Sequence, residues 1–314
     1  MRAVFVGGCE RSGTTFLGSL LGAHSHCIAT PESHFKIEPL LSEIEKRGGR
    51  PDADILRAVK EDVQLRLWNL AEPEIRGLDE AVSADEAMYA IVRAYGRKVR
   101  RTDVSVWIDH TPSNVKYITR LGRHFPGARF IHVIRDGRAV AASLMRVKFG
   151  PNTIKACADH WMGRIAAGLA AEATLPAGVM MRVHYEDLVH ETELTVRKIC
   201  GFVGLEFEES MLSASGFRPE AFGGKVNRLV GGPPVPDRAA AWESALDRRQ
   251  IEIFEAWTGD LLPCLGYELK CAPARGPSWP EKLRMDLKEV AGRIVHATTY
   301  RWSQRRHATR GPAR

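Results

Sequence analysis

The stretch AVFVGGCERSGTTFL, Ala3–Leu17, decides the fold. It begins with the apolar run AVFV, which predicts a short buried strand, and passes through glycines into a helical pattern. Read from Gly8, the frame is Gly-x-x-x-x-Gly-Thr-Thr, that of a phosphate-binding loop with Thr14 where NTP-binding loops carry lysine. Glycines 7, 8 and 13 are expected to let the backbone turn tightly, so that its N–H groups converge on an anion at the start of the following helix.

The side chains of this loop add to the anion site. Thr14 and Thr15 supply hydroxyl donors at the first helical positions, and the cation of the loop is Arg11. A lysine near the end of such a loop serves the β- and γ-phosphates of a nucleoside triphosphate. Its absence favours a donor with a single 5′-phosphate that bears a transferable group. The alternative is a glycine-rich turn that binds nothing.

The rest of the chain alternates short apolar runs with helical patterns, which is typical of a parallel sheet covered by helices. The further strands expected are Val104–Ile108, Arg129–Ile134 and Met180–Val183. Helices are expected at Thr14–Ala23, Asn114–His124, Arg138–Val147 and Glu191–Val203. We predict an α/β fold of three layers and P-loop type, with a central parallel sheet flanked by helices and a ligand site beyond the carboxyl ends of the strands.

Four parts of the chain define the expected domain organisation. Residues 1–270 form one α/β domain, and residues 271–314 form a basic helical tail. Residues 39–103 are a helical insertion between the first two strands, of the kind that caps a site, with Ile55 to Leu67 on one helix. Residues 215–240, rich in Gly and Pro, are interpreted as a long mobile loop.

Composition indicates a globular protein, with 44% hydrophobic and 26% charged residues. The six cysteines form no Cys-x-x-Cys pair, which favours reduced thiols over disulfides or a zinc site. The chain also shows no apolar stretch of about 20 residues and no charged-then-apolar leader. We therefore expect a cytoplasmic protein that holds no metal.

The net charge of +7 is concentrated at the C-terminal end. Residues 281–314 hold nine Lys/Arg against three acids, whereas the other 280 residues hold 36 against 35. The body therefore offers no basic face to nucleic acid, and no nucleic-acid partner is expected. Within the tail, Leu283, Leu287, Val290 and Ile294 form a helical stripe. This helix either packs on the body or lies peripherally on an anionic membrane such as the inner membrane surface.

A second anion site is expected in FIHVIRDGRAVAASL, Phe130–Leu144. Arg135 ends a buried strand, and Ser143 lies eight residues further on, within the next helix. That spacing lets a guanidinium and a hydroxyl meet at one anion. The alternative is an ordinary turn with an internal ion pair.

Two segments carry candidates for a general base. TPESHF, Thr30–Phe35, supplies Glu32 and His34, and WIDHTPSN supplies His110. A histidine is charged only part of the time near neutral pH and can accept a proton there. The alternatives are a solvated turn residue for Glu32 and a structural histidine for His110.

These motifs, in this order, resemble those of the sulfotransferases that use 3′-phosphoadenosine 5′-phosphosulfate (PAPS). The segment Arg11, Ser12, Gly13, Thr14, Thr15 is similar to the 5′-phosphosulfate loop of the protein-tyrosine and bacterial carbohydrate branch. Arg135 and Ser143 resemble the family's 3′-phosphate site. YEDLV resembles a segment whose tyrosine, here Tyr185, lies near the nucleotide, and Trp242–Glu268 resembles the family's last helix.

The resemblance covers nearly residues 1–270 and implies a PAPS-dependent, metal-free transfer of the sulfuryl group to a hydroxyl acceptor. It implies that Glu32 is the base and that Arg11 serves the 5′-phosphosulfate. His110 replaces a lysine of relatives, so it is the base for a sugar hydroxyl or a structural group. Lys225 and Arg228 fall in the nucleotide-closing loop and are expected to reach the 3′-phosphate.

Two other functions remain open from the sequence. A P-loop kinase or NTPase needs a lysine at position 14 and a carboxylate for magnesium, for which Asp109 is the candidate. A non-catalytic nucleotide-binding module needs neither. A glycan or glycolipid is the expected acceptor, with a tyrosyl protein and a small natural product as alternatives.

Overall fold

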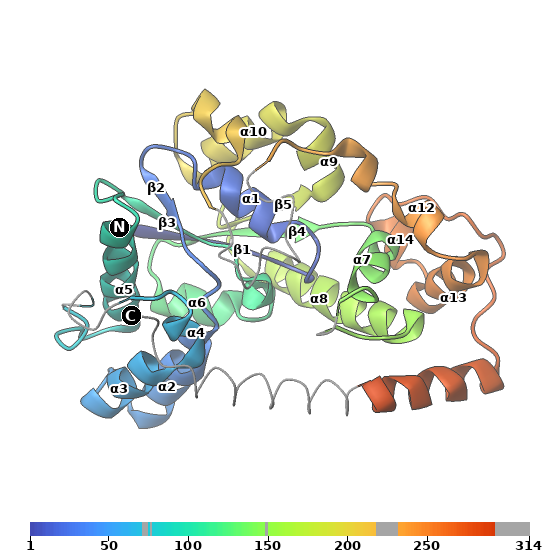
Figure 1. Ribbon diagram of the computed structural model, residues 1–314, viewed down its shortest axis with the longest axis horizontal. Coiled ribbons are helices and arrows are strands. Elements are labelled where there is room, and N and C mark those ends of the chain that lie inside the picture. The colour runs from blue at the N-terminus through green and yellow to red at the C-terminus, as the bar shows by residue number, and fades with distance from the viewer. Residues whose placement is uncertain (71–74, 76, 148–149, 218–231, 293–314) are drawn as a thin grey trace. The chain divides into compact units, whose positions relative to one another are not determined.

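The computed structural model describes residues 1–70, 75, 77–147, 150–217 and 232–292. The chain divides into two compact units. The first comprises residues 1–134 and 164–236, and the second residues 135–163 and 237–314. The helix α8 (Ile154–Thr174) contributes to both (Figure 1).

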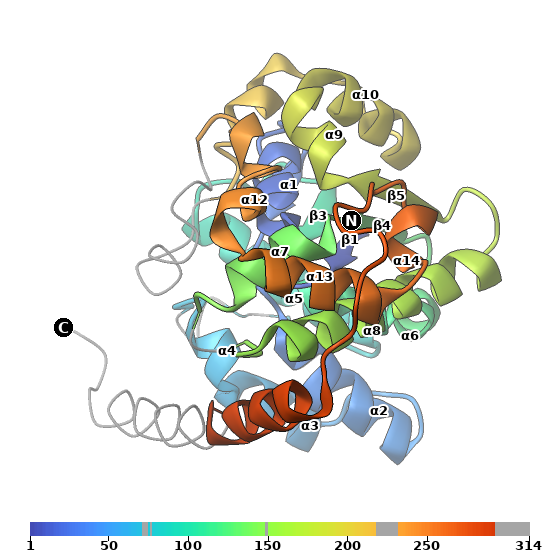
Figure 2. The ribbon, with the colours of Figure 1, turned by 90° about the vertical axis from the view of Figure 1, so that its right-hand side faces the viewer.

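A parallel sheet of five strands lies at the centre of the first unit, in the order β2-β3-β1-β4-β5. The strands are β1 (Arg2–Gly8), β2 (Cys27–Ala29), β3 (Val106–Asp109), β4 (Arg129–Ile134) and β5 (Met180–His184). The helices α1 (Thr14–Leu21), α9 (Tyr185–His190) and α10 (Thr192–Val203) cover one face, while α6 (Ile118–His124) and α8 cover the other (Figures 1 and 2). The predicted three-layer parallel architecture is therefore confirmed.

The central strand β1 is covered on both faces. Its residues from Ala3 onward are buried, as expected for an apolar run in the middle of a parallel sheet. The ring of Phe5 stacks on that of Phe130 at 5.6 Å and meets the edges of Trp107 and Phe125 at 5.5 and 5.1 Å. These contacts pack β1 tightly against its neighbours just before the loop that follows it.

The glycines of β1 act differently from the prediction. Gly7 and Gly8 are strand residues, and a Cβ on them would lie 2.5 Å from the Val115 nitrogen and 2.4 Å from the Val133 oxygen, respectively. They therefore permit close packing of neighbouring backbone. The left-handed residues of the loop are Arg11, with φ of 73°, and Gly13, with φ of 97°.

The helix expected over Asn114–His124 is divided. A 3₁₀ turn spans Pro112–Lys116, and α6 begins at Ile118. The side-chain amide of Asn114 donates to the backbone oxygens of Val6 and Asp109, both at 3.2 Å. These bonds anchor the turn to β1 and to the end of β3, so the helix starts only after it.

The insertion contains the expected helices, with two corrections. It follows β2, which is only three residues long and was not predicted, so it does not lie between the first two strands. Its helices are α2 (Ser42–Arg47), α3 (Ala53–Glu61), α4 (Val63–Arg66) and α5 (Ala84–Lys98). The prediction of a single helix from Ile55 to Leu67 was wrong. Asp62 adopts an extended backbone, and its carboxylate caps α4 by accepting from the Gln64 N–H.

The second unit is helical in its described part. It contains α7 (Gly137–Leu144), the beginning of α8, α12 (Trp242–Ala245), α13 (Arg248–Thr258), α14 (Leu261–Cys264) and helical residues 279–292. Phe254 and Trp161 pack against Gly137, where a Cβ would lie 2.6 to 2.8 Å from their rings. None of the described helices is both long and apolar enough to cross a bilayer. The domain boundaries expected at residues 270 and 271 stay predictions.

Candidate nucleotide and acceptor site

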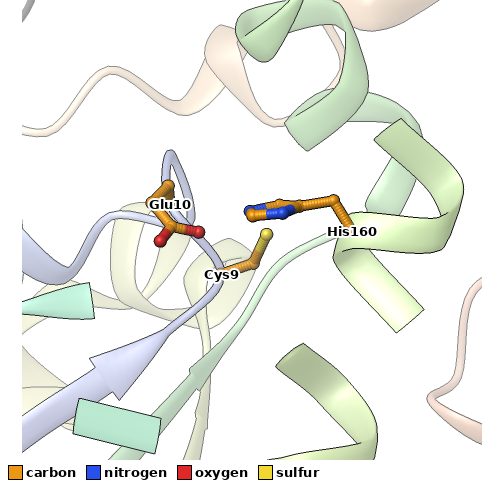
Figure 3. A group of neighbouring side chains, drawn as sticks. All are labelled: Cys9, Glu10 and His160. Carbon is orange, nitrogen blue, oxygen red and sulfur yellow. The ribbon is translucent and has the colours of Figure 1, made fainter. Parts of the chain in front are cut away.

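The loop between β1 and α1 forms the first candidate anion site. Ser12 N donates to Cys9 O at 3.0 Å, and α1 begins at Thr14 as predicted. The first N–H groups of a helix have no intrahelical acceptor and are available to an anion. Glu10 of this loop pairs with Arg164 at 2.6 Å. Figure 3 draws Cys9 and Glu10 on this loop, and also His160 on the part of α8 that belongs to the second unit.

One hydroxyl of the loop, that of Ser12, is buried. Ser12 Oγ has no hydrogen-bond partner among the described residues, and Ser12 is fully buried. A buried polar atom left unsatisfied costs about 1–3 kcal/mol. A ligand oxygen at the loop would remove this cost, so Ser12 indicates that the loop receives a polar group.

Tyr185 lies directly against this loop. A Cβ on Gly13 would be 2.5 Å from Cδ2 of the Tyr185 ring. Tyr185 is buried at the start of α9, which follows β5. The structure therefore brings Tyr185 to the predicted phosphate loop from a segment 172 residues away in the sequence.

Glu32 and His34 follow β2 and are open to solvent. Their side chains are 39% and 44% exposed, and Glu32 Oε2 lies 3.0 Å from His34 Nε2. The other ring nitrogen of His34 lies 3.4 Å from Ser113 Oγ, and Trp68 Nε1 donates to the Glu32 backbone oxygen at 3.3 Å. The backbone of Glu32 is thus held while its carboxylate remains accessible.

His110 is buried at the end of β3, and neither ring nitrogen has a hydrogen-bond partner among the described residues. Its ring packs against Gly18 of α1, where an added Cβ would lie 2.6 Å from the imidazole. The centroids of the His110 and Phe217 rings are 4.7 Å apart. Burial lowers the pKa of His110, and Lys36 lowers it further, whereas the carboxylates of Glu32 and Asp109 oppose the shift. The imidazole is therefore neutral at pH 7, and the structure brings it within electrostatic reach of Glu32.

Asp109 is fully buried, and both its carboxylate oxygens are engaged. Oδ2 lies 2.8 Å from Lys36 Nζ and 2.6 Å from Ser33 Oγ, while Oδ1 accepts from Thr111 N at 2.9 Å. Burial alone would raise the pKa of Asp109, but these partners hold it well below its usual range. The role of magnesium carboxylate, which the kinase alternative required, does not fit this residue.

Sequence reasoning did not find Lys36 and Ser33. Their partner Asp109 is more than 70 residues away, so local spacing holds no trace of the contact. The one available signal was a lysine between Phe35 and Ile37, two apolar residues, because a charge in such a run requires a buried partner.

The second candidate anion site belongs to the second unit. Arg135 follows β4 directly, and its Nη2 donates to Arg238 O at 2.8 Å. Ser143 lies on α7, as predicted. The turn also holds an internal ion pair, made by Asp136 and Arg138 at 2.8 Å. Binding of one anion by Arg135 and Ser143 stays a prediction, and Lys225 and Arg228 lie outside the described residues.

Comparison with known proteins gives concordant matches. Residues 3–209 match the model of the Sulfotransferase family. Protein-tyrosine sulfotransferase 1 of Danio rerio is 23% identical over 83% of this chain and 67% of its own length. Protein-tyrosine sulfotransferase 2 of Gallus gallus is 26% identical over 68% of this chain and 53% of its own length. The chain thus spans between about half and two thirds of these relatives.

Two solved structures share the fold. The sulfotransferase domain from the curacin biosynthetic pathway has a TM-score of 0.60 and 17% identity, with 86% of this chain and 99% of that domain covered. The sulfotransferase domain from the Synechococcus PCC 7002 olefin synthase has a TM-score of 0.61 and 22% identity, with 85% and 95% covered.

Proposed function

The chain belongs to the sulfotransferase family, and from this premise we propose that it transfers the sulfuryl group of PAPS to the hydroxyl group of an acceptor. The loop after β1 carries the proposal, because the hydroxyl of Ser12, two residues before α1, is buried and has no hydrogen-bond partner among the described residues. A loop without lysine suits a donor whose 5′-phosphate bears a sulfuryl group instead of further phosphates. Both carboxylate oxygens of Asp109 already have protein partners, so this residue does not favour a nucleotide that is bound with magnesium.

The proposed reaction is an in-line displacement at sulfur. The acceptor oxygen forms a bond to sulfur while the bond from sulfur to the bridging oxygen breaks, and 3′-phosphoadenosine 5′-phosphate (PAP) leaves. The loop supplies Arg11, the hydroxyls of Ser12, Thr14 and Thr15, and helix N–H groups to the charge that develops on the leaving phosphate. Positioning and charge stabilisation carry such transfers, as they do for phosphoryl groups.

Glu32 is the proposed general base. Its carboxylate is exposed, so an acceptor can reach it, and its backbone is held by Trp68. General bases of this kind contribute roughly 10²–10⁴-fold to the rate. His110, neutral and unpartnered within the described chain, is proposed to hydrogen-bond the acceptor hydroxyl and orient it toward Glu32.

The remaining nucleotide contacts are also proposals. Tyr185 lies on the loop and is proposed to contact the nucleotide. Arg135 and Ser143 are proposed to hold the 3′-phosphate, because a guanidinium binds phosphate through strong, charge-assisted hydrogen bonds.

We propose a phenolic hydroxyl as the first acceptor to test. The relatives are named for protein tyrosine, and a phenol, with a pKa of about 10, loses its proton more readily than a sugar hydroxyl. The glycan or glycolipid expected from the sequence, and a small natural product, are the competing acceptors.

The test is transfer of radiolabelled sulfate from PAPS to a panel of tyrosyl peptides, glycans, glycolipids and small phenols in the presence of EDTA. We expect label on one acceptor class and no loss of rate with EDTA. Magnesium-dependent phosphate transfer from ATP would instead identify a kinase. PAP binding without turnover on any acceptor would identify a binding module.

A membrane contact is proposed for helical residues 279–292. Their acids face their own unit: Glu281 pairs with Arg249 at 2.8 Å, and Glu289 accepts from Asn152 N at 2.9 Å. The opposite stripe is solvent-exposed, by 44% at Leu283, 63% at Leu287 and 58% at Val290. Arg284 and Lys288 lie on the same helix beside this stripe. An outward apolar stripe with flanking cations fits an anionic lipid surface.

Vesicle partition tests this contact. We expect the full chain to bind phosphatidylserine vesicles and Leu287→Asp to weaken binding at least about tenfold, since a charge in the stripe opposes burial in lipid. Leu194→Asp, at a leucine that is 49% exposed on α10, is the matched control and should leave partition unchanged. Equal partition of both variants would contradict the contact.

A further inference from the structure

An ion pair with no exposed surface lies next to the candidate bases. Lys36 Nζ is 2.8 Å from Asp109 Oδ2, and neither side chain has any exposed area. Burying two charges is unfavourable unless good geometry and further hydrogen bonds compensate for the lost water. Such a pair is therefore poor support for stability alone, and its position invites a functional explanation.

Hydrogen bonds complete the pair. Ser33 Oγ donates to Asp109 Oδ2 at 2.6 Å and accepts from Lys36 Nζ at 3.2 Å. Lys36 also donates to the Ser33 backbone oxygen at 3.3 Å, and its Nζ lies 5.9 Å from the Phe5 ring centroid. The pair is thus bonded to the segment after β2 and packed on the central strand.

The same bonds join two segments that are far apart in the sequence. Ser33 directly follows Glu32, and Asp109 directly precedes His110. Ser33 N donates to Thr111 Oγ1 at 3.0 Å, so a second bond crosses between the segments beside the ion pair. The backbone that carries Glu32 is thereby fixed to the strand end that carries His110.

We propose that Lys36 and Asp109 are positioning residues that set the place of Glu32 relative to His110 for the transfer. This inference rests on the proposed function. Both side chains are fully buried, so they act through Glu32 and His110 without touching the acceptor.

The two charges of the pair have opposite effects on the pKa of neighbouring groups, so the variants can be told apart by pH dependence. Around His110, burial and Lys36 lower the pKa of the imidazole, whereas Glu32 and Asp109 raise it. Around Lys36, burial lowers the pKa of the ammonium, and Asp109 and Glu32 oppose this. Removing the positive charge of Lys36 is therefore expected to raise the pKa of His110, and removing the negative charge of Asp109 to lower it.

The experiment compares Lys36→Met, Asp109→Asn and the double variant in the full chain. We expect kcat to fall in each single variant by up to about 100-fold, the loss that misplacement of reacting groups by about 1 Å can cause. The Kd of PAP should stay within about twofold of wild type, because the pair does not touch the phosphate loop. The pH profile of kcat/KM should shift upward in Lys36→Met and downward in Asp109→Asn.

Lys60→Met is the matched control. Lys60 pairs with Asp79 at 2.7 Å, but at the surface, so its removal should leave kcat and the pH profile unchanged. If a single variant fails to fold, the double variant, which leaves no unpaired buried charge, carries the test through its lowered kcat.

Two results would overturn the inference. One is a wild-type kcat in the folded double variant. The other is an unshifted pH profile in both folded single variants, which would leave the pair a merely structural role. Failure of the proposed function differs from both, because wild-type protein would then transfer no sulfate to any acceptor.

Discussion

The strands β1 and β3 are neighbours in the sheet, but the buried polar groups at their ends differ in how many hydrogen-bond partners they have. After β1, Ser12 Oγ has no partner among the described residues. At the end of β3, Asp109 accepts from Lys36, Ser33 and Thr111. An unsatisfied buried group is costly, whereas hydrogen bonds to a charged group are strong. The first turn is therefore suited to receive a ligand, and the second to hold its neighbours in place.

His110 sharpens this comparison because it directly follows Asp109 in the sequence. Both residues are buried, but the imidazole of His110 has no partner within the described chain. The strand end thus combines a carboxylate whose two oxygens are engaged with an imidazole whose nitrogens have no partner among the described residues.

The largest effect is expected from Glu32→Gln. If Glu32 takes the acceptor proton, kcat should fall roughly 10²–10⁴-fold. PAP affinity, measured by calorimetry, should not change, because Glu32 lies after β2 and not in the phosphate loop. An unchanged kcat would transfer the base role to a histidine.

A smaller effect is expected from Gly13→Ala. Gly13 has φ of 97°, and an added Cβ would lie 2.5 Å from the Tyr185 ring. The strained backbone costs about 1–3 kcal/mol, and displacement of Tyr185 should weaken PAP binding about tenfold or more.

Gly48→Ala is the matched control for this variant. Gly48 has φ of 104° with nothing within 4 Å of an added Cβ, so it should lose stability without losing PAP affinity. Equal PAP affinity in both variants would show that the loop does not bind the nucleotide.

The smallest effect concerns pH. Burial lowers the pKa of folded His110, whereas an unfolded histidine titrates near pH 6.5, at about its ordinary value. Below about pH 6.5, His110 binds a proton in the unfolded chain but not yet in the folded chain. The free energy of unfolding therefore decreases as the pH falls.

Urea denaturation at pH 7.5 and 5.5 checks this sign. Between these two pH values the free energy of unfolding should decrease more for wild type than for His110→Leu, by up to about 1.4 kcal/mol per pH unit below 6.5. A larger loss in the variant would contradict a neutral, buried His110.

The sequence predicted those features that local pattern encodes. The apolar runs of β1 and β4 mark buried parallel strands, and the glycine-rich frame around Gly13 marks the turn from β1 into α1. The anion site expected at this turn stays a prediction. In contrast, β2 has three residues and no alternation to detect. The contact of Lys36 with Asp109 depends on how distant segments pack, which no local spacing records.

The unexpected breaks in helices have similar causes. Asp62 ends one helix and caps the next, and Asn114 bonds to β1 and to the end of β3. The carboxylate of Asp62 binds a backbone N–H at the start of the second helix, whereas the amide of Asn114 ties its turn to β1 and β3. The apolar periodicity continues across these positions, so the pattern alone predicted unbroken helices.

The central claim is that the loop after β1 binds PAPS without magnesium. Its most direct test is the thermal shift of the protein with PAP in EDTA, for wild type, Arg11→Ala and the surface control Arg57→Ala, whose side chain is 68% exposed on α3. We expect PAP to raise the Tm of wild type and Arg57→Ala and to have no effect on Arg11→Ala. An equal shift in Arg11→Ala, or a wild-type shift only with ATP and magnesium, would contradict the claim.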